Sequence, residues 1–79
     1  MRVLFFASLR DGVGQAEAEV QATRVSEILP ALEATLSAAG LELLREANVR
    51  IAVNQTLVET DLPLQHGDEV AFLPPVTGG

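Results

Sequence analysis

The stretch EVAFLPP, residues 69–75, indicates how the chain is organised. Its first five residues predict a strand, and Pro74 and Pro75 end that strand because a proline nitrogen has no hydrogen to donate to a sheet. A second apolar run, VLFFA at residues 3–7, is typical of a strand covered on both faces. We therefore expect segments 3–7 and 69–73 to lie side by side at the centre of one sheet.

The segment after the first strand predicts a hairpin. Gly12 and Gly14 mark a turn, and polar and apolar residues then alternate over residues 17–22. Strict alternation is the pattern of a half-buried strand, which we expect to pair with segment 3–7. Its buried face would carry Ala18, Val20 and Ala22.

One main helix is predicted in the middle of the chain. Apolar residues recur there at helical spacing, namely Val25, Ile28, Leu29, Leu32 and Leu36. Thr23 is a candidate cap and Gly40 a candidate stop signal. Pro30 falls inside the stripe, so the helix either starts late, near Ser26, or is kinked.

The remaining segments complete the plan of the domain. They predict a short helix over 41–47, strands over 49–53 and 56–58 joined by a turn at 54–55, an irregular stretch over 61–64 and a tight turn over 66–68. The expected fold is α+β, a mixed sheet of four to five strands packed on one main helix. We expect this domain to cover residues 1–73 and an extended tail to cover 74–79.

Composition excludes several kinds of site. The 79 residues carry five arginines, no lysine and eleven acids, for a net charge of −6, which argues against nucleic acid and suits a basic partner. With no cysteine and one histidine, His66, we expect no metal site. No run approaches the roughly 20 apolar residues of a membrane span, so we expect a cytoplasmic protein.

The C-terminal tail has no obvious structural role. Pro74 and Pro75 stiffen its start, and the six residues after Leu73 extend about 20 Å at most. Gly78 and Gly79 have no side chains, so the terminal carboxylate fits a channel too narrow for other residues. The alternative is an ordinary frayed terminus.

The second unexplained feature is an apolar sheet face. If the residues at positions 3, 5, 70 and 72 face the helix, alternation turns Leu4, Phe6, Ala71 and Leu73 the other way. Leu57 on a neighbouring strand would join them. Such exposed patches usually mark a partner site, unless the segment 41–44 folds over this face.

Catalytic groupings are not evident in the sequence. Ser8 has no histidine near it, and Asp68 and Glu69 point to opposite faces of a strand, so they form no carboxylate pair. The two-glycine turn at 12–14 is too short for a phosphate loop.

Three segments together resemble a known family. Residues 3–7 (VLFFA), 52–58 (AVNQTLV) and above all 67–79 (GDEVAFLPPVTGG) closely resemble the small subunits of molybdopterin synthase, which are ubiquitin-like β-grasp sulfur carriers. The likeness spans essentially the whole chain, although residues 15–48 contribute little to it.

The resemblance implies a function for the tail. In that family an E1-like enzyme uses ATP to adenylate the terminal carboxylate, here Gly79, and a sulfur donor protein converts it to a thiocarboxylate. Residues 74–78, Pro74, Pro75, Val76, Thr77 and Gly78, would thread this group into the large synthase subunit, which delivers the sulfur to a cyclic pyranopterin. No permanently bound cofactor is implied.

The resemblance also implies partners and contact residues. It places Phe6, Leu57 and Leu73 against the large subunit, in an assembly of two small and two large subunits, and makes Arg10 a contact to the activating enzyme. The chain would not be catalytic alone. Alternatives are a sibling carrier for thiamine or nucleoside thiolation, a protein-conjugating modifier, or a plain interaction module.

Overall fold

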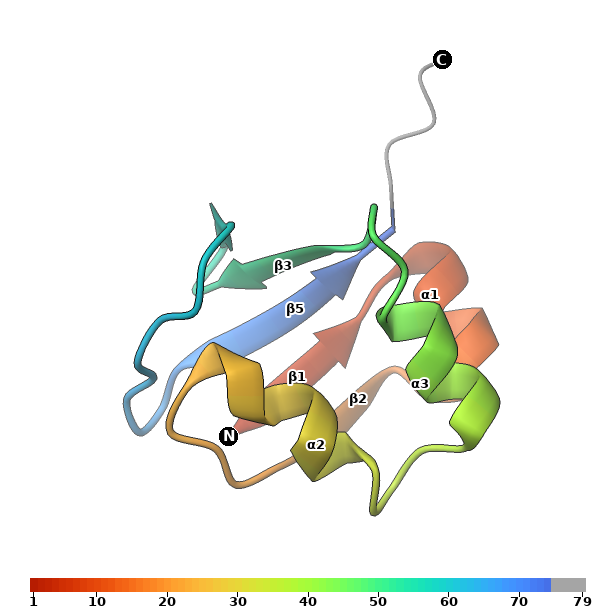
Figure 1. The fold of residues 1–79 in the computed structure, drawn as a ribbon, viewed down its shortest axis with the longest axis horizontal. Helices are drawn as coiled ribbons and strands as arrows, with labels where there is room; N and C mark the ends of the chain where they lie inside the picture. Colours follow the sequence, from red (N-terminus) through yellow and green to blue (C-terminus); the bar gives the residue numbers. More distant parts are fainter. Residues whose placement is uncertain (75–79) are drawn as a thin grey trace.

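The computed structural model describes residues 1–74, and the five residues from Pro75 to Gly79 lie outside the described part. The described residues form a five-stranded sheet in the order β2-β1-β5-β3-β4 (Figure 1). The strands β1 and β5 are parallel neighbours, whereas the other pairs are antiparallel. Their bounds are Arg2–Phe5 (β1), Glu17–Glu19 (β2), Arg50–Val53 (β3), Thr56–Val58 (β4) and Glu69–Leu73 (β5). The expected central pairing of segments 3–7 and 69–73 is confirmed.

Short helices cover one face of this sheet. They are α1 (Ala7–Val13), the 3₁₀ turn η1 (Val25–Glu27), α2 (Ile28–Leu32) and α3 (Ala38–Leu44). Figure 1 shows α2 and α3 lying over the strands, with α1 beside α3 at the end of β1. The core between helices and sheet consists of Val3, Phe5, Leu9, Val20, Ile28, Leu32, Leu36, Leu41, Leu44, Val70 and Phe72. The α+β prediction is confirmed, and the cover that we expected from one main helix is shared among these elements.

The connection between β1 and β2 differs from the predicted turn. The strands do pair antiparallel, with Val3 opposite Ala18, but the chain between them forms helix α1. Gly12 lies inside this helix, and Gly14 ends it with φ +90°. Seven residues with only Leu9 fully buried give too weak a helical stripe to be recognised next to two glycines.

Pro30 is accommodated by a late helix start. It is the third residue of α2, where a backbone N–H has no partner within the helix in any case. The 3₁₀ turn η1 precedes it, beginning one residue before Ser26. Of the two alternatives, the late start is therefore correct.

Two predicted helix boundaries are wrong. Thr23 is not a cap, because its backbone N–H and its hydroxyl both donate to Glu27 Oε1, at 2.7 and 2.9 Å. Gly40 does not end a helix but lies inside α3, whose cap is Ser37; the Ser37 Oγ accepts from the Gly40 N–H at 3.1 Å. The α2 helix ends before it, at Leu32.

The tight turns after β3 and before β5 are fastened to each other. Asn54 and Gln55 have φ of +49° and +70°, as a two-residue hairpin turn requires. The Asn54 side chain accepts from the Glu69 N–H and donates to Asp68 Oδ1, both at 3.0 Å. Both predicted turns, at 54–55 and 66–68, are confirmed. The hydrogen bonds between them fix the position at which the central strand β5 begins.

Candidate functional site: the open face of the sheet

The face of the sheet opposite the helices carries an apolar patch. Strand register places Leu4 beside Ala71, Ala71 beside Ala52, and Ala52 beside Leu57, so one apolar row crosses four strands. Phe6 and Leu73 extend it at the ends of β1 and β5. We call these six residues, Leu4, Phe6, Ala52, Leu57, Ala71 and Leu73, the open-face patch.

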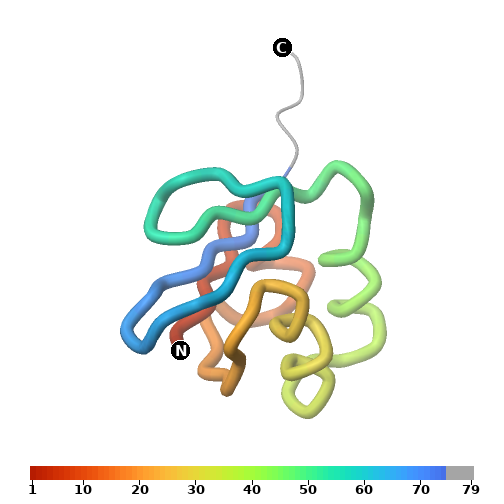
Figure 2. The backbone as a smooth tube through the Cα atoms, turned by 60° about the vertical axis from the view of Figure 1, so that its left-hand side comes forward, coloured from red at the N-terminus to blue at the C-terminus, as the bar shows by residue number. Residues whose placement is uncertain are grey.

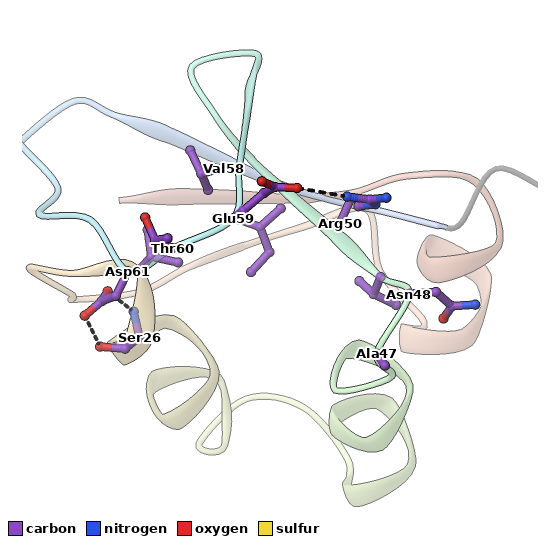
Figure 3. A pocket seen from close by; sticks show the side chains of 11 residues that line it. Ser26, Ala47, Asn48, Arg50, Val58, Glu59, Thr60 and Asp61 are labelled. Atoms are coloured by element: carbon purple, nitrogen blue, oxygen red, sulfur yellow. Dashed lines mark hydrogen bonds and ion pairs between the residues drawn. The ribbon is translucent and has the colours of Figure 1, made fainter.

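Two large side chains of the open-face patch are exposed in the described part of the chain. Phe6 is 44% exposed and Leu57 is 56% exposed, which is unusual for large apolar side chains. The alternative that segment 41–44 covers this face is wrong, because Leu41 and Leu44 lie in the core on the helical side. Figure 3 shows the strands nearly edge-on with the helices below them.

Backbone geometry at the end of β1 fixes Phe6 on this face. The Phe6 N–H donates to the Phe72 carbonyl at 3.2 Å, so the residue continues the sheet for one step. The next residue, Ala7, has φ +50°, a left-handed conformation that disfavours residues with a Cβ. This sharp turn starts α1 immediately and leaves the Phe6 side chain exposed.

The predicted tail begins beside the open-face patch. Leu73 is the last residue of β5, which lies between β1 and β3, and it faces Arg50 across the β3 pair. The chain therefore leaves the sheet from its central strand. The predicted roles of Pro75, Val76, Thr77, Gly78 and Gly79 fall outside the described residues, and the domain boundary at 73 stays a prediction.

Ion pairs border the open-face patch on both sides. Arg2 lies 3.1 Å from Glu17 and 4.0 Å from Glu69, and Arg50 lies 3.8 Å from Glu59. These rim charges, and Ala52, which is buried at the middle of the patch, were not expected from the sequence. The alternation over 49–53 contained the signal, since it turns Arg50 and Ala52 to the face opposite Ile51.

Arg10, the predicted contact to an activating enzyme, lies on α1. Its side chain is exposed, and its nearest ion-pair partner is the adjacent Asp11, at 3.9 Å. Such a pair between neighbouring exposed side chains constrains the guanidinium little. The suggested contact stays a prediction.

An open cavity lies on the helical side, between η1, β3 and the loop that follows α3 (Figure 3). Its polar wall is already occupied by internal bonds, because the Asp61 carboxylate accepts from the Arg24 Nε, the Ser26 N–H and the Ser26 hydroxyl at 2.8 to 3.0 Å. These hydrogen bonds, first that of Arg24, hold the pKa of Asp61 below its usual range. Asp61 thus fastens the loop after β4 to η1, and the backbone of that loop passes close to the segment that contains η1 (Figure 2).

Other chemistry is not evident among the described residues. Residues 1–74 contain no group of three or more side chains suited to holding a metal ion. His66 is exposed in its turn. None of the helices in the described part is long and apolar enough to cross a membrane.

Comparison with known proteins identifies the family. The model of the ThiS family matches residues 3–79. The chain belongs to the ThiS family. It is 44% identical over 85 aligned positions to the molybdopterin synthase sulfur carrier subunit of Escherichia coli K12, an alignment covering all of this chain and 99% of that protein. The resemblance to the small subunits of molybdopterin synthase is confirmed.

Solved structures confirm the ubiquitin-like β-grasp fold of this ThiS-family chain. The small archaeal modifier protein 1 of Methanosarcina acetivorans superimposes with a TM-score of 0.79 over 99% of this chain and 94% of that one; at 24% identity it shows the fold alone. A subunit in the complex of subunits 1 and 2 of the molybdopterin-converting factor from Helicobacter pylori 26695 gives 0.71 at 28% identity, covering 99% and 96%.

Proposed function

We propose that this chain is the sulfur carrier subunit of molybdopterin synthase. One observation carries the proposal: the open-face patch ends at Leu73, where the chain leaves the sheet toward Gly78 and Gly79. The patch binds a partner surface, and the residues after it reach into that partner. The 44% identity over the full length of the Escherichia coli carrier supports this arrangement.

The large synthase subunit is the proposed occupant of the open-face patch. Phe6, Leu57 and Leu73 supply apolar surface whose burial stabilises a complex by about 25 cal/mol per Å² before the costs of association. The Helicobacter pylori complex of subunits 1 and 2 supports such a pairing. We propose an assembly of two small and two large subunits, with the active site on the large subunit.

The chemistry takes place on the Gly79 carboxylate. A carboxylate is a poor acyl donor, so an E1-like enzyme first uses ATP to convert it to an acyl-adenylate. Sulfide released by a donor protein then attacks the acyl carbon, the carbon–oxygen bond to AMP breaks, AMP leaves with the electron pair, and a thiocarboxylate remains. This soft nucleophile is delivered to a cyclic pyranopterin precursor in the partner's site.

The tail residues and Arg10 have supporting roles in the proposal. Pro74 and Pro75 stiffen the exit from the sheet, and Val76 and Thr77 carry the chain onward to Gly78, whose lack of a side chain suits a narrow channel. Arg10 contacts the activating enzyme. The small subunit itself supplies no catalytic side chain.

Intact mass spectrometry tests the carrier chemistry. The chain is incubated with the activating enzyme, ATP and a sulfur donor, and we expect the mass to rise by one sulfur-for-oxygen exchange, located at Gly79 by fragmentation. A Gly79-deleted chain is the control and should stay unchanged. An unmodified wild-type chain, with synthase activity retained after deletion of Gly79, would overturn the proposal.

A second step distinguishes the pathway. The charged chain is mixed with the large subunit and the cyclic precursor, and formation of the dithiolene product is followed. Sulfur transfer only to a thiamine or nucleoside acceptor would assign the chain to a sibling pathway. Gly79 joined to target lysines in cells would instead identify a protein modifier.

A further inference from the structure

Apart from the single histidine, His66, every basic side chain of this protein is an arginine. The 79 residues contain five arginines and no lysine, and each arginine forms an ion pair with a carboxylate. Exposed pairs of this kind contribute little to stability, and a lysine ammonium serves most of them nearly as well. Two arginines within residues 1–74 also donate a hydrogen bond, Arg24 Nε to Asp61 at 2.8 Å and Arg45 Nη2 to Glu33 at 3.0 Å, and a lysine ammonium is a hydrogen-bond donor as well. The fold therefore does not explain why lysine is absent.

The α-amino group of Met1 is the one remaining amine among the 79 residues, and it is already bound. It pairs with the Glu19 carboxylate and donates to the Val20 carbonyl at 2.9 Å. It also lies at the far end of the sheet from Leu73, because β1 and β5 run parallel with Arg2 opposite Glu69.

Arg50 is the arginine beside the exit of the tail. It is opposite Leu73 in the strand register, so their Cα atoms are about 5 Å apart. Its side chain lies on the open face, is 58% exposed, and has a single, loose ion-pair partner in Glu59 at 3.8 Å. The six residues after Leu73 extend up to about 20 Å, which brings Gly79 within reach of position 50.

We propose that lysine is excluded from this surface because its amine would be acylated by the protein's own activated C-terminus, and that Arg50 is the position where the exclusion matters most. The inference rests on the proposed activation of Gly79. A guanidinium keeps its proton and offers no lone pair at neutral pH, whereas an ε-amine in equilibrium with its ammonium does. Arginine at position 50 thus keeps the positive charge beside the tail without a competing nucleophile.

The side reaction that is avoided can be written atom by atom. The lone pair of an ε-amine attacks the Gly79 carbonyl carbon of the acyl-adenylate, and a carbon–nitrogen bond forms. The carbon–oxygen bond to AMP breaks, AMP leaves with the electron pair, and the amine proton passes to water. The product is an amide that cannot accept sulfur. Placing the amine on the same chain speeds such a step greatly, because intramolecular partners have high effective concentrations.

A C-terminal thioester at Gly79, made by thiol cleavage of an intein fusion of the full chain, provides the test. Wild type, Arg50→Lys and Arg2→Lys are kept at neutral pH and followed by intact mass. Arg2 is the matched control: it lies on the same face, is 56% exposed, and faces Glu69 at the other end of β5, about 13 Å from Leu73. Both substitutions keep the charge, and urea unfolding verifies the fold of each.

We expect wild type to give only the hydrolysed acid and Arg50→Lys to give an amide lighter than that acid by one water. Peptide mapping should locate the link at position 50, and Arg2→Lys should give several-fold less amide. Hydrolysis of Arg50→Lys at the wild-type rate without amide would overturn the proposal, and equal amide from both variants would overturn the part given to Arg50. No activating enzyme is used, so failure here is distinct from failure of the sulfur-transfer assay.

Discussion

The two faces of the central strands have similar composition but opposite environments. On β5, Val70 and Phe72 point to the helices and are fully buried, while Ala71 and Leu73 point to the open face and are only partly covered. Both faces are apolar because both become buried. Folding buries one of them, and in our proposal a partner protein buries the other. An apolar face that the fold leaves open is therefore a more informative signal than the apolar content of the chain.

Truncation of Phe72 should produce the largest difference in stability between substitutions on the two faces. Phe72 is 0% exposed and stacks on Phe5 with ring centroids 5.9 Å apart. Phe72→Ala should cost about 3–5 kcal/mol of unfolding free energy, a large part of the roughly 5–10 kcal/mol expected for a domain of this size. Urea unfolding measures this.

A gentler variant keeps the test decisive if Phe72→Ala does not fold. Phe72→Leu should cost about 1–2 kcal/mol. Leu57→Ala, on the open face, should stay within about 0.5 kcal/mol of wild type. Equal losses at positions 72 and 57 would show that the two faces are not distinct in stability.

The reverse result is expected for binding. Phe6→Ala and Leu57→Ala should each weaken binding to the large synthase subunit by about 2 kcal/mol, roughly 30-fold, because each removes a large exposed apolar side chain that binding would bury. Titration calorimetry with purified large subunit measures the dissociation constant.

Leu62 offers a matched control for binding. It is 37% exposed, an apolar side chain of the same size as Leu57, but it lies in the loop beside η1 and outside the open-face patch. Leu62→Ala should leave the affinity unchanged. If Leu62→Ala and Leu57→Ala weaken binding equally, the open-face patch is not the docking surface.

The sequence predicts the sheet better than its helical cover. Strands 3–7 and 69–73 are recognised because continuous apolar runs bounded by glycine or proline have few other interpretations. The helices are short, so each contributes too few turns for a clear period, as α1 with Leu9 alone fully buried illustrates. The outward direction of Phe6, Leu57 and Leu73 followed from alternation, a local rule.

Contacts between distant segments could not be predicted in this way. Asp61 binds the Ser26 N–H from 35 residues away, and Asn54 binds Asp68 across two turns. Their geometry depends on the folded arrangement of the whole chain. The same limit applies to Arg50, whose place opposite Leu73 depends on the register of β3 with β5.

Substitutions at two glycines test how tightly the helices pack together over the helical side of the sheet. Gly40 lies inside α3, and a Cβ built there would meet Val13 Cα at 3.6 Å and Leu36 Cβ at 3.9 Å, which are ordinary contacts. Gly40→Ala should therefore stabilise the protein by about 0.5–1 kcal/mol, since alanine loses less backbone entropy in a helix. Thermal and urea unfolding measure the change.

Gly14 is the contrasting position. It also has room for a Cβ, but its φ of +90° disfavours every L-residue, so Gly14→Ala should destabilise the protein by about 1 kcal/mol. Destabilisation by Gly40→Ala would mean that α1 and α3 lie too close together for even a methyl group, and hence that the cover is tighter than these contacts indicate.

The smallest expected effect concerns the loop that closes the helical side. The pKa of Asp61 is lowered, first by the hydrogen bond from Arg24 and then by that from the Ser26 N–H. A carboxylate whose pKa is lower in the folded state than in the unfolded state stabilises the fold above its ordinary pKa near 3.9, and that contribution is lost as pH falls through the folded value. The urea concentration at the unfolding midpoint of wild type should therefore decrease as the pH is lowered from about 5 to about 2.

Asp61→Asn should reduce this fall without abolishing it, because the pKa values of Glu27 and Asp68 are also lowered, by hydrogen bonds from Thr23 and Gln65 respectively. Glu42→Gln is the control, since Glu42 is exposed on α3 and forms no ion pair within residues 1–74. The open face lies on the other side of the sheet from this loop, so binding of Asp61→Asn to the large subunit at neutral pH should match wild type. Weakened binding in this variant alone would show that the two faces are coupled through the sheet, and the separation of folding from docking would then fail.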